Sequence, residues 1–129
     1  MWNNIENMIL YEDKEIIVCH KAAGIAVQSA RIEMPDMEST LKNYLIAKNP
    51  GKIPYLGVVH RLDQPVEGVL VFAKNKKAAA GLTGQITSGS VTKEYLAVTA
   101  QKVEKVQGHL EDYLKKDGKT NTSAVVTSK

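Results

Sequence analysis

The sequence is poor in cysteine and arginine and has no long hydrophobic run. Its one cysteine, Cys19, can form no disulfide within the chain and cannot supply a thiolate metal site. The longest apolar runs, such as residues 69–73, are far shorter than the roughly 18 residues that a membrane-spanning helix needs. The first residues show no basic region followed by an apolar stretch, so we predict no secretory signal and a cytoplasmic location. These absences argue against disulfide-rich scaffolds, zinc ribbons and membrane proteins.

The residues that are present describe an ordinary globular domain. The chain has 129 residues, of which 43% are hydrophobic and 24% charged. A domain of this size buries roughly two thirds of its unfolded surface, so it needs neither disulfides nor a structural metal to fold. Residues 1–73 contain 7 basic and 9 acidic side chains, whereas residues 74–129 contain 10 and 5. The basic second half is compatible with a polyanionic partner, although its dispersed lysines are more simply explained as a solvated surface.

Hydrophobic patterning predicts two helices and several strands. Two β-rich runs at residues 8–11 and 15–20, joined by a short polar connection, predict a hairpin, after which Gly24 allows a turn. Ser39 stands ahead of apolar residues at helical spacing and predicts a capped helix that ends near residues 49–51. A second helix is predicted over residues 76–87.

The remaining runs predict the rest of a sheet. Strands are expected over residues 55–59, 69–73 and 92–99, and another begins at residues 124–126. Residues 103–114 fit a strand or a helix equally, and the polar residues 115–123 predict a loop. Strands and helices that do not strictly alternate predict an α+β fold, with a mixed, mostly antiparallel sheet and flanking helices.

The densest group of reactive side chains lies in residues 60–68, between two predicted strands. Pro65 and its effect on the preceding residue should stiffen this loop, and Gly68 permits a positive φ. Asp63 follows Arg61 by two residues, and a nearby guanidinium would keep the carboxylate ionised. The simpler alternative is a surface ion pair of little energetic value. A metal held by His60 and Asp63 lacks an evident third ligand.

Residues 60–63 have the sequence His-Arg-Leu-Asp, which with its flanks closely resembles the catalytic motif of the RluA-type family of RNA pseudouridine synthases. Two further blocks occur in the family's order: residues 9–24 are similar to its opening hairpin, and residues 91–97 to its Lys-x-Tyr motif. The resemblance extends from about Ile9 to the end of the chain. The chain differs at residues 66–67, Val-Glu where the family commonly has Thr-Ser, and at Ala22, where proline is usual.

The resemblance implies an isomerase that converts specific uridines in structured rRNA or tRNA to pseudouridine, with no metal or cofactor and an oligomeric state left open. Residues 1–129 would be the N-terminal part of a pseudouridine synthase catalytic domain, because the family's basic Gly-Arg-x-His-Gln segment is absent. A separate RNA-binding domain is not expected. The alternative is a pseudouridine synthase-like domain that binds RNA without turnover. A glycosidase is a more distant alternative, in which Glu67 is the only candidate for a second carboxylate.

In the implied reaction, Asp63 acts at C1′ of the ribose, either as a covalent nucleophile or as a base in a glycal route. Arg61 would orient this carboxylate or fill the space that a flipped base leaves. Tyr95, more often a core residue when judged by its strand alone, would stack on the uracil and help to remove the C5 proton. His60 would support the loop, and Lys93 would contact phosphates. The expected site is therefore catalytic Asp63 with the substrate-binding or supporting residues Arg61, Tyr95, His60, Leu62 and Lys93.

Overall fold

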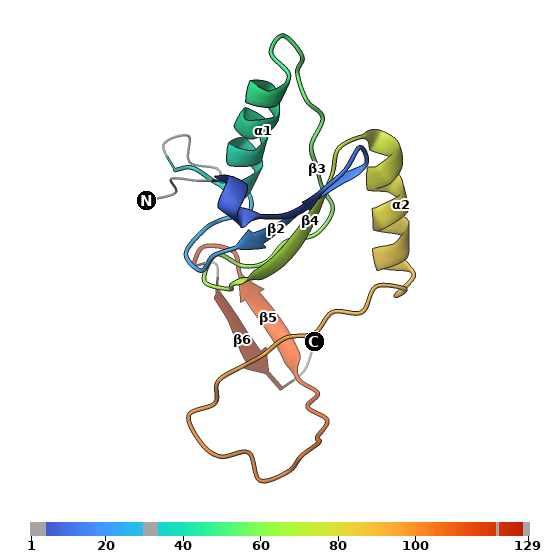
Figure 1. The fold of residues 1–129 in the computed structure, drawn as a ribbon. Coiled ribbons are helices and arrows are strands. Elements are labelled where there is room, and N and C mark those ends of the chain that lie inside the picture. The colour runs from blue at the N-terminus through green and yellow to red at the C-terminus, as the bar shows by residue number, and fades with distance from the viewer. Residues whose placement is uncertain (1–4, 30–33, 121, 128–129) are drawn as a thin grey trace. The chain divides into compact units, whose positions relative to one another are not determined.

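The computed structural model describes residues 5–29, 34–120 and 122–127. The chain divides into two units, the first extending to Lys93 and the second running from Glu94 onward (Figure 1). The predicted catalytic loop belongs to the first unit, and the tyrosine of the Lys-x-Tyr block belongs to the second.

A four-stranded antiparallel sheet forms the centre of the first unit (Figure 1). A 3-10 turn, η1 (Ile5–Met8), precedes the hairpin of β1 (Ile9–Glu12) and β2 (Ile16–Lys21). The strand β4 (Gly68–Ala73) lies between β2 and the short β3 (Gly57–Val58), giving the order β1-β2-β4-β3. The predicted hairpin and the α+β class are therefore confirmed, whereas the strand predicted over residues 55–59 is only two residues long.

Two helices accompany this sheet. α1 (Met37–Lys48) begins at Asp36, whose carboxylate accepts from the backbone N–H of Ser39, while the Ser39 hydroxyl accepts from the N–H of Asp36. Ser39 is therefore the third helical residue of a capping box and not the cap itself, so the predicted start is wrong by one turn. The predicted end is confirmed, because Asn49 closes the helix and Gly51 follows with φ +86°.

The second predicted helix is confirmed in full. α2 (Lys76–Thr87) is capped by Asn75, whose side chain accepts from the backbone N–H of Ala78 at 2.8 Å. The helix lies alongside β3 and β4 (Figure 1). A Cβ atom at Gly57 would lie 3.2 Å from Cβ of Ala79, so the absence of a side chain at Gly57 allows this close packing.

The core lies between α1 and one face of the sheet. Alternate residues of β2 point inward, because successive side chains of a strand face opposite sides. The buried hydrophobic residues come from the strands, from α1 and from the segments on either side of it: Ile17, Cys19, Ile25, Val27, Met37, Leu41, Leu45, Leu56, Leu70 and Phe72.

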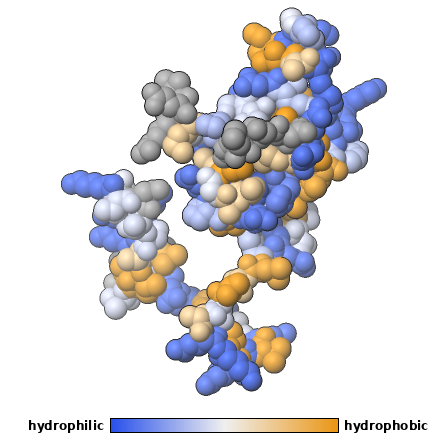
Figure 2. All heavy atoms as spheres, turned by 60° about the vertical axis from the view of Figure 1, so that its left-hand side comes forward, coloured by the Kyte–Doolittle hydropathy of each residue, from blue (hydrophilic) through white to orange (hydrophobic). Residues whose placement is uncertain are grey.

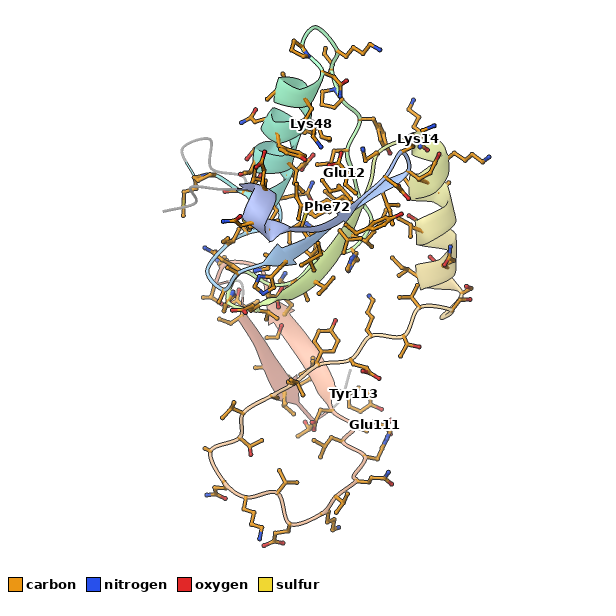
Figure 3. All side chains as sticks on the ribbon, in the orientation of Figure 1. Glu12, Lys14, Lys48, Phe72, Glu111 and Tyr113 are labelled. Atoms are coloured by element: carbon orange, nitrogen blue, oxygen red, sulfur yellow. The ribbon has the colours of Figure 1, made fainter. Side chains whose placement is uncertain are left out.

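A cluster of charged groups ties β1 to α1 and to the end of β4. The carboxylate of Glu12 accepts from Lys74 at 2.8 Å and from Lys48 at 2.9 Å, and the hydroxyl of Tyr44 donates to it at 2.9 Å (Figure 3). Burial alone would raise the pKa of Glu12, but these hydrogen bonds outweigh it and lower the pKa to about 2. The side chain of Glu12 is only 17% exposed. The cluster therefore holds three elements together through one carboxylate.

The second unit is a hairpin preceded by a long irregular segment. β5 (Tyr113–Asp117) pairs antiparallel with β6 (Thr122–Val126), so the loop predicted over residues 115–123 is wrong except at its turn. The strand predicted from residue 124 is confirmed as part of β6. The strand predicted over residues 92–99 is not formed. Of residues 103–114, for which a strand or a helix was predicted, only Tyr113 and Leu114 lie in a strand, at the start of β5. A strand needs a neighbour to pair with its backbone groups, and in the described part of the chain neither sheet includes residues 92–99.

None of the helices in the described part of the chain is long and apolar enough to cross a membrane.

Candidate active-site loop

Residues 59–67 connect β3 to β4 and carry Asp63 at their centre. The backbone N–H of Val66 donates to the carbonyl of Asp63 at 3.0 Å and closes a tight turn. Asp63 is exposed. The loop therefore presents a carboxylate to solvent from a rigid connection between two strands.

Two hydrogen bonds join this loop to the segment that follows β2. The N–H of Gly24 donates to the carbonyl of Gln64 at 2.8 Å, and the side-chain amide of Gln64 donates to the carbonyl of Gly24 at 2.9 Å. Gly24 has φ +86°, a left-handed conformation that glycine adopts without strain. The predicted turn at Gly24 thus has a second role, since it holds the residue next to Asp63.

A buried ammonium group strengthens the same junction. Lys21 is fully buried, and its Nζ donates to the carbonyls of Ile25 at 2.7 Å, Gln64 at 3.1 Å and Ala22 at 3.2 Å. Burial lowers the pKa of Lys21, while the charges of Asp63 and Glu67 act in the opposite direction. The candidate catalytic carboxylate therefore lies within electrostatic reach of this lysine.

Sequence reasoning missed Lys21 as a site residue, although the sequence contains a signal for it. In β2, Ile17, Cys19 and Lys21 alternate with outward residues and share the inner face of the sheet. A lysine at an inward position of a core strand must satisfy its ammonium with internal partners. The carbonyls of two loops are the partners it uses.

The apolar residue of the His-Arg-Leu-Asp block anchors the loop to the core. Leu62 is half-buried and packs against the core cluster. A Cβ atom at Gly68 would lie 3.1 Å from Cδ1 of Leu62, so this leucine occupies the space that a side chain would take. Gly68 does not have the positive φ that we expected, because it is the first residue of β4 and its φ is that of a strand. Its lack of a side chain matters for packing instead.

His60 is half-buried at the start of the loop. Its Nε2 accepts a hydrogen bond from the backbone N–H of Val71 in β4 at 3.1 Å. Burial lowers the pKa of His60, and the positive charge of Lys93 lowers it further. Lys93 therefore lies close enough to the loop for its charge to act on His60.

Arg61 makes a different contact from the one we expected. Its Nη1 donates to Oε1 of Gln28 at a long 3.5 Å, and no ion pair joins it to Asp63 in the described parts of the chain. The short spacing along the sequence did not bring the two charges together. The Arg61–Asp63 surface ion pair, which was the simpler alternative for these residues, is therefore not formed in the described parts of the chain.

Glu67, one of the residues that depart from the family's usual pattern, contacts a side chain of β2. Oε1 of Glu67 lies 3.1 Å from Nε2 of His20 on β2, and both side chains are largely solvent-accessible. The side-chain contact of the loop with β2 therefore uses Glu67 and not Arg61. Within the described ranges, no three His, Cys, Asp or Glu side chains group together as a metal site would require.

Two expected site residues lie at or beyond the division between the units. Lys93 is the last residue of the first unit and is exposed. Tyr95 belongs to the second unit and its side chain is 66% exposed. Neither residue lies in a strand.

Comparisons with known proteins point to one family. A family model described as RNA pseudouridylate synthase matches residues 15–129. Ribosomal large subunit pseudouridine synthase D of Xylella fastidiosa is 39% identical over 92 residues, which are 70% of this chain and 27% of that protein. The uncharacterized RNA pseudouridine synthase YlyB of Bacillus subtilis is 31% identical over 124 residues, 92% of this chain and 40% of that protein. The chain thus spans less than half the length of these curated relatives.

A solved structure shows the same fold at low sequence identity. The human RNA pseudouridylate synthase domain containing 4 matches with a TM-score of 0.57 and 24% identity, over 67% of this chain and 31% of that chain. This likeness concerns the fold alone.

Proposed function

The chain belongs to the RNA pseudouridylate synthase family, of the RluA type, and on that premise we propose that the protein isomerises uridine in RNA to pseudouridine. We assign residues 1–129 to part of the catalytic domain, in keeping with the small share of its relatives that the chain spans. The name of the Bacillus protein points to RNA, and that of the Xylella protein points to the ribosomal large subunit. We therefore propose ribosomal RNA as the substrate, with the cytoplasm as the location of the reaction.

The observation that carries this proposal is the exposed carboxylate of Asp63 on a loop fastened at both sides. In the reaction, the bond between N1 of uracil and C1′ of ribose breaks, the base turns, and a bond from C5 to C1′ forms. The C5 proton leaves and N1 takes up a proton, so the product is an isomer of uridine. Positive charge develops at C1′ when the first bond breaks. A fixed carboxylate stabilises such charge or captures C1′, as in glycosidases. We assign this role to Asp63.

The anchors of the loop give this carboxylate its position. Gln64 is bonded to Gly24 and Lys21, and Leu62 is packed on the core. A displacement of about 1 Å can cost about 100-fold in rate, so anchors on both neighbours of Asp63 have direct catalytic value. Moving the target base out of its stack costs a few kcal/mol in a duplex. We propose that the exposed Arg61 fills the space that the base leaves.

The decisive test compares the whole protein with its Asp63→Asn variant on ribosomal RNA carrying tritium at C5 of uridine. Tritium release reports the departure of the C5 proton. We expect a loss of at least about 1000-fold for Asp63→Asn, because the nucleophile or charge-stabilising group is removed. Asp112→Asn in the second unit is the matched control and should retain the wild-type rate. An unchanged rate in Asp63→Asn would refute the assignment of Asp63.

We propose that Tyr95 stacks on the uracil and that its hydroxyl assists removal of the C5 proton. Tyr95→Phe keeps the ring and removes only the hydroxyl, so RNA affinity should persist while tritium release slows by about 10- to 100-fold. The matched control is Tyr113→Phe, on β5 of the same unit. Equal rates for Tyr95→Phe and wild type would leave Tyr95 with stacking alone.

A second candidate function, RNA binding without turnover, is favoured for the isolated chain by residues 94–112. These residues, which include Tyr95, form no helix or strand and are all exposed. A base-stacking tyrosine in such a segment is not held in a catalytic geometry. We therefore expect the 129-residue chain to bind RNA in a salt-dependent manner but to release little or no tritium. Turnover by this chain at a rate close to that of the whole protein would contradict this second candidate.

A further inference from the structure

The contact between His60 and β4 replaces a strand hydrogen bond. β3 pairs with β4 at only two positions, Gly57 with Ala73 and Val58 with Phe72. The next backbone group along β4 is the N–H of Val71, and it donates to Nε2 of His60 and not to a strand carbonyl. The imidazole therefore satisfies a backbone donor at the point where β3 ends and the catalytic loop begins.

This hydrogen bond requires one protonation state and one tautomer. An imidazole nitrogen accepts only when it carries no proton, so a neutral ring with its proton on Nδ1 is needed. A protonated ring has donors alone and would leave the N–H of Val71 without a partner. Among the charges acting on His60, Lys93 favours the neutral ring, and so does burial.

The neighbouring elements supply few other charges. β3 and β4 contain no ionisable side chain over Gly57–Val58 and Gly68–Ala73. The other charged or titratable groups on the surrounding elements belong to the loop itself, to β2, to α2 and to the segment before β3: Arg61, Asp63, Glu67, His20, Lys21, Lys76, Lys77 and Tyr55. Two contacts of the loop involve a histidine, that of His20 with Glu67 and that of His60 with Val71, and only the second joins the loop to a backbone group of β4. A histidine contact of this kind changes its hydrogen bonding when the ring takes up a proton.

We propose that His60 is a positioning residue, a proton-sensitive latch whose neutral imidazole fixes the loop that carries Asp63 to β4 and whose protonation releases it. His60 does not exchange a proton with the substrate in this role. Only the part of the proposal that concerns Asp63 in catalysis rests on the proposed function. The latch itself is a property of the folded chain and can be measured without RNA.

The direct test is nuclear magnetic resonance on the 129-residue chain. Nitrogen shifts of the His60 ring should show the Nδ1–H tautomer at pH 8, and its titration midpoint should lie below 6.5. As pH falls through that midpoint, the exchange protection factor of the Val71 amide should fall by about tenfold, the effect of one lost hydrogen bond. The amide shifts of Leu62 and Asp63 should titrate with the same midpoint. An Nε2–H tautomer at pH 8, or Val71 protection that does not change through the midpoint, would overturn the latch.

Two variants separate the hydrogen bond from the mere presence of a ring. His60→Gln offers an amide oxygen as an acceptor that does not titrate, so protection of Val71 should persist from pH 8 to pH 5 and the shifts of Asp63 should no longer follow pH. His60→Ala has no acceptor, and protection should be low at every pH. His109→Gln, in the exposed part of the second unit, is the matched control and should titrate like wild type at Val71. If His60→Gln keeps the wild-type pH dependence, another group is responsible and the proposal fails.

The pH profile of the whole protein distinguishes this proposal from the proposed function. We expect the rate constant of tritium release to fall on the acidic side with the midpoint of His60, and we expect His60→Gln to lose that limb while its rate at pH 8 stays within about tenfold of wild type. If Asp63→Asn is inactive but the acidic limb survives in His60→Gln, the latch is refuted and the catalytic assignment stands. If Asp63→Asn is fully active while Val71 follows His60, the latch stands and the catalytic assignment fails.

Discussion

The two units differ in where their apolar side chains lie. All the buried hydrophobic residues of the described chain belong to the first unit, packed between the sheet and α1. In the second unit every described residue is exposed except Val126, which is half-buried, and Leu114 is 68% exposed. Figure 2 shows hydrophobic side chains open to solvent on the surface of the chain. An isolated two-stranded hairpin is marginally stable in water, so the stability of the chain resides in the first unit.

The two candidate catalytic side chains, Asp63 and Tyr95, belong to different units. Asp63 lies in the unit with a core of its own, where Lys21, Leu62 and Gln64 hold its loop. Tyr95 lies in the unit without one. Groups that must be placed to within a fraction of an ångström depend on a packed scaffold. The comparison therefore predicts that substitutions will have large effects in one unit and small effects in the other.

The largest effect should come from the core. Phe72→Ala removes a fully buried ring and should lower the free energy of unfolding by about 3–5 kcal/mol, because it loses buried area and leaves a cavity. Leu114→Ala in the second unit is the contrasting variant and should change it by less than about 0.5 kcal/mol. Urea titration followed by circular dichroism measures both. Similar losses in the two variants would mean that the hairpin is packed in solution, and the comparison would fail.

The second effect concerns the buried ammonium beneath the loop. Lys21→Met keeps most of the side-chain volume but removes the ammonium donor from three carbonyls, of which that of Gln64 keeps the N–H of Gly24, so we expect a loss of about 2–3 kcal/mol. The amides of Gly24 and Val66, which donate to the carbonyls of Gln64 and Asp63, should also exchange faster with solvent. Lys14→Met, at an exposed position of the β1–β2 turn, should be close to neutral. If the amides of Gly24 and Val66 exchange as in wild type, the two loops are joined without Lys21.

The third effect is smaller and depends on pH. The pKa of Glu12 is lowered to about 2, so its contribution to stability is fully present above about pH 4.5 and is lost as pH falls through about 2. Glu12→Gln should cost about 1–2 kcal/mol at pH 7 and should flatten the loss of stability between pH 4.5 and 2. Thermal unfolding at several pH values measures this. Glu111→Gln, in the exposed part of the second unit, should leave the acid limb as it is.

The elements that could be predicted from the sequence are those whose signals are local. The capping residue, the apolar spacing and the length of α2 all depend on residues 75–87 alone, and the predicted bounds of this helix agree with the structure. The start of α1 was missed because Ser39 fits the role of a cap, whereas Asp36 three residues earlier takes it in a capping box. Residues 92–99 have strand composition but pair with no strand among the described residues, and β propensity alone cannot supply one.

Part of the candidate site could also be predicted, because the loop that carries Asp63 has a local sequence signal. The loop between β3 and β4 and the presence of Asp63 within it follow from the local pattern of residues 55–73. The partners of its residues do not, because they come from distant parts of the chain. Arg61 contacts Gln28, where proximity in sequence suggested Asp63, and Glu67 contacts His20. Lys21 could have been found from its inward position in β2, but which carbonyls it binds could not.

The bonds between the two loops have a consequence for the order in which the molecule assembles. Gln64 is 40 positions from Gly24 and 43 from Lys21 along the chain, whereas the β1–β2 hairpin and both helices close through neighbouring residues. Bringing distant segments together costs chain entropy before any contact compensates for it, so long-range pairings form slowly. The hairpin and helices should therefore appear first during refolding. The bonds around Asp63 should appear only after β4 has docked on β2, so the protein acquires its candidate catalytic geometry in its last folding step.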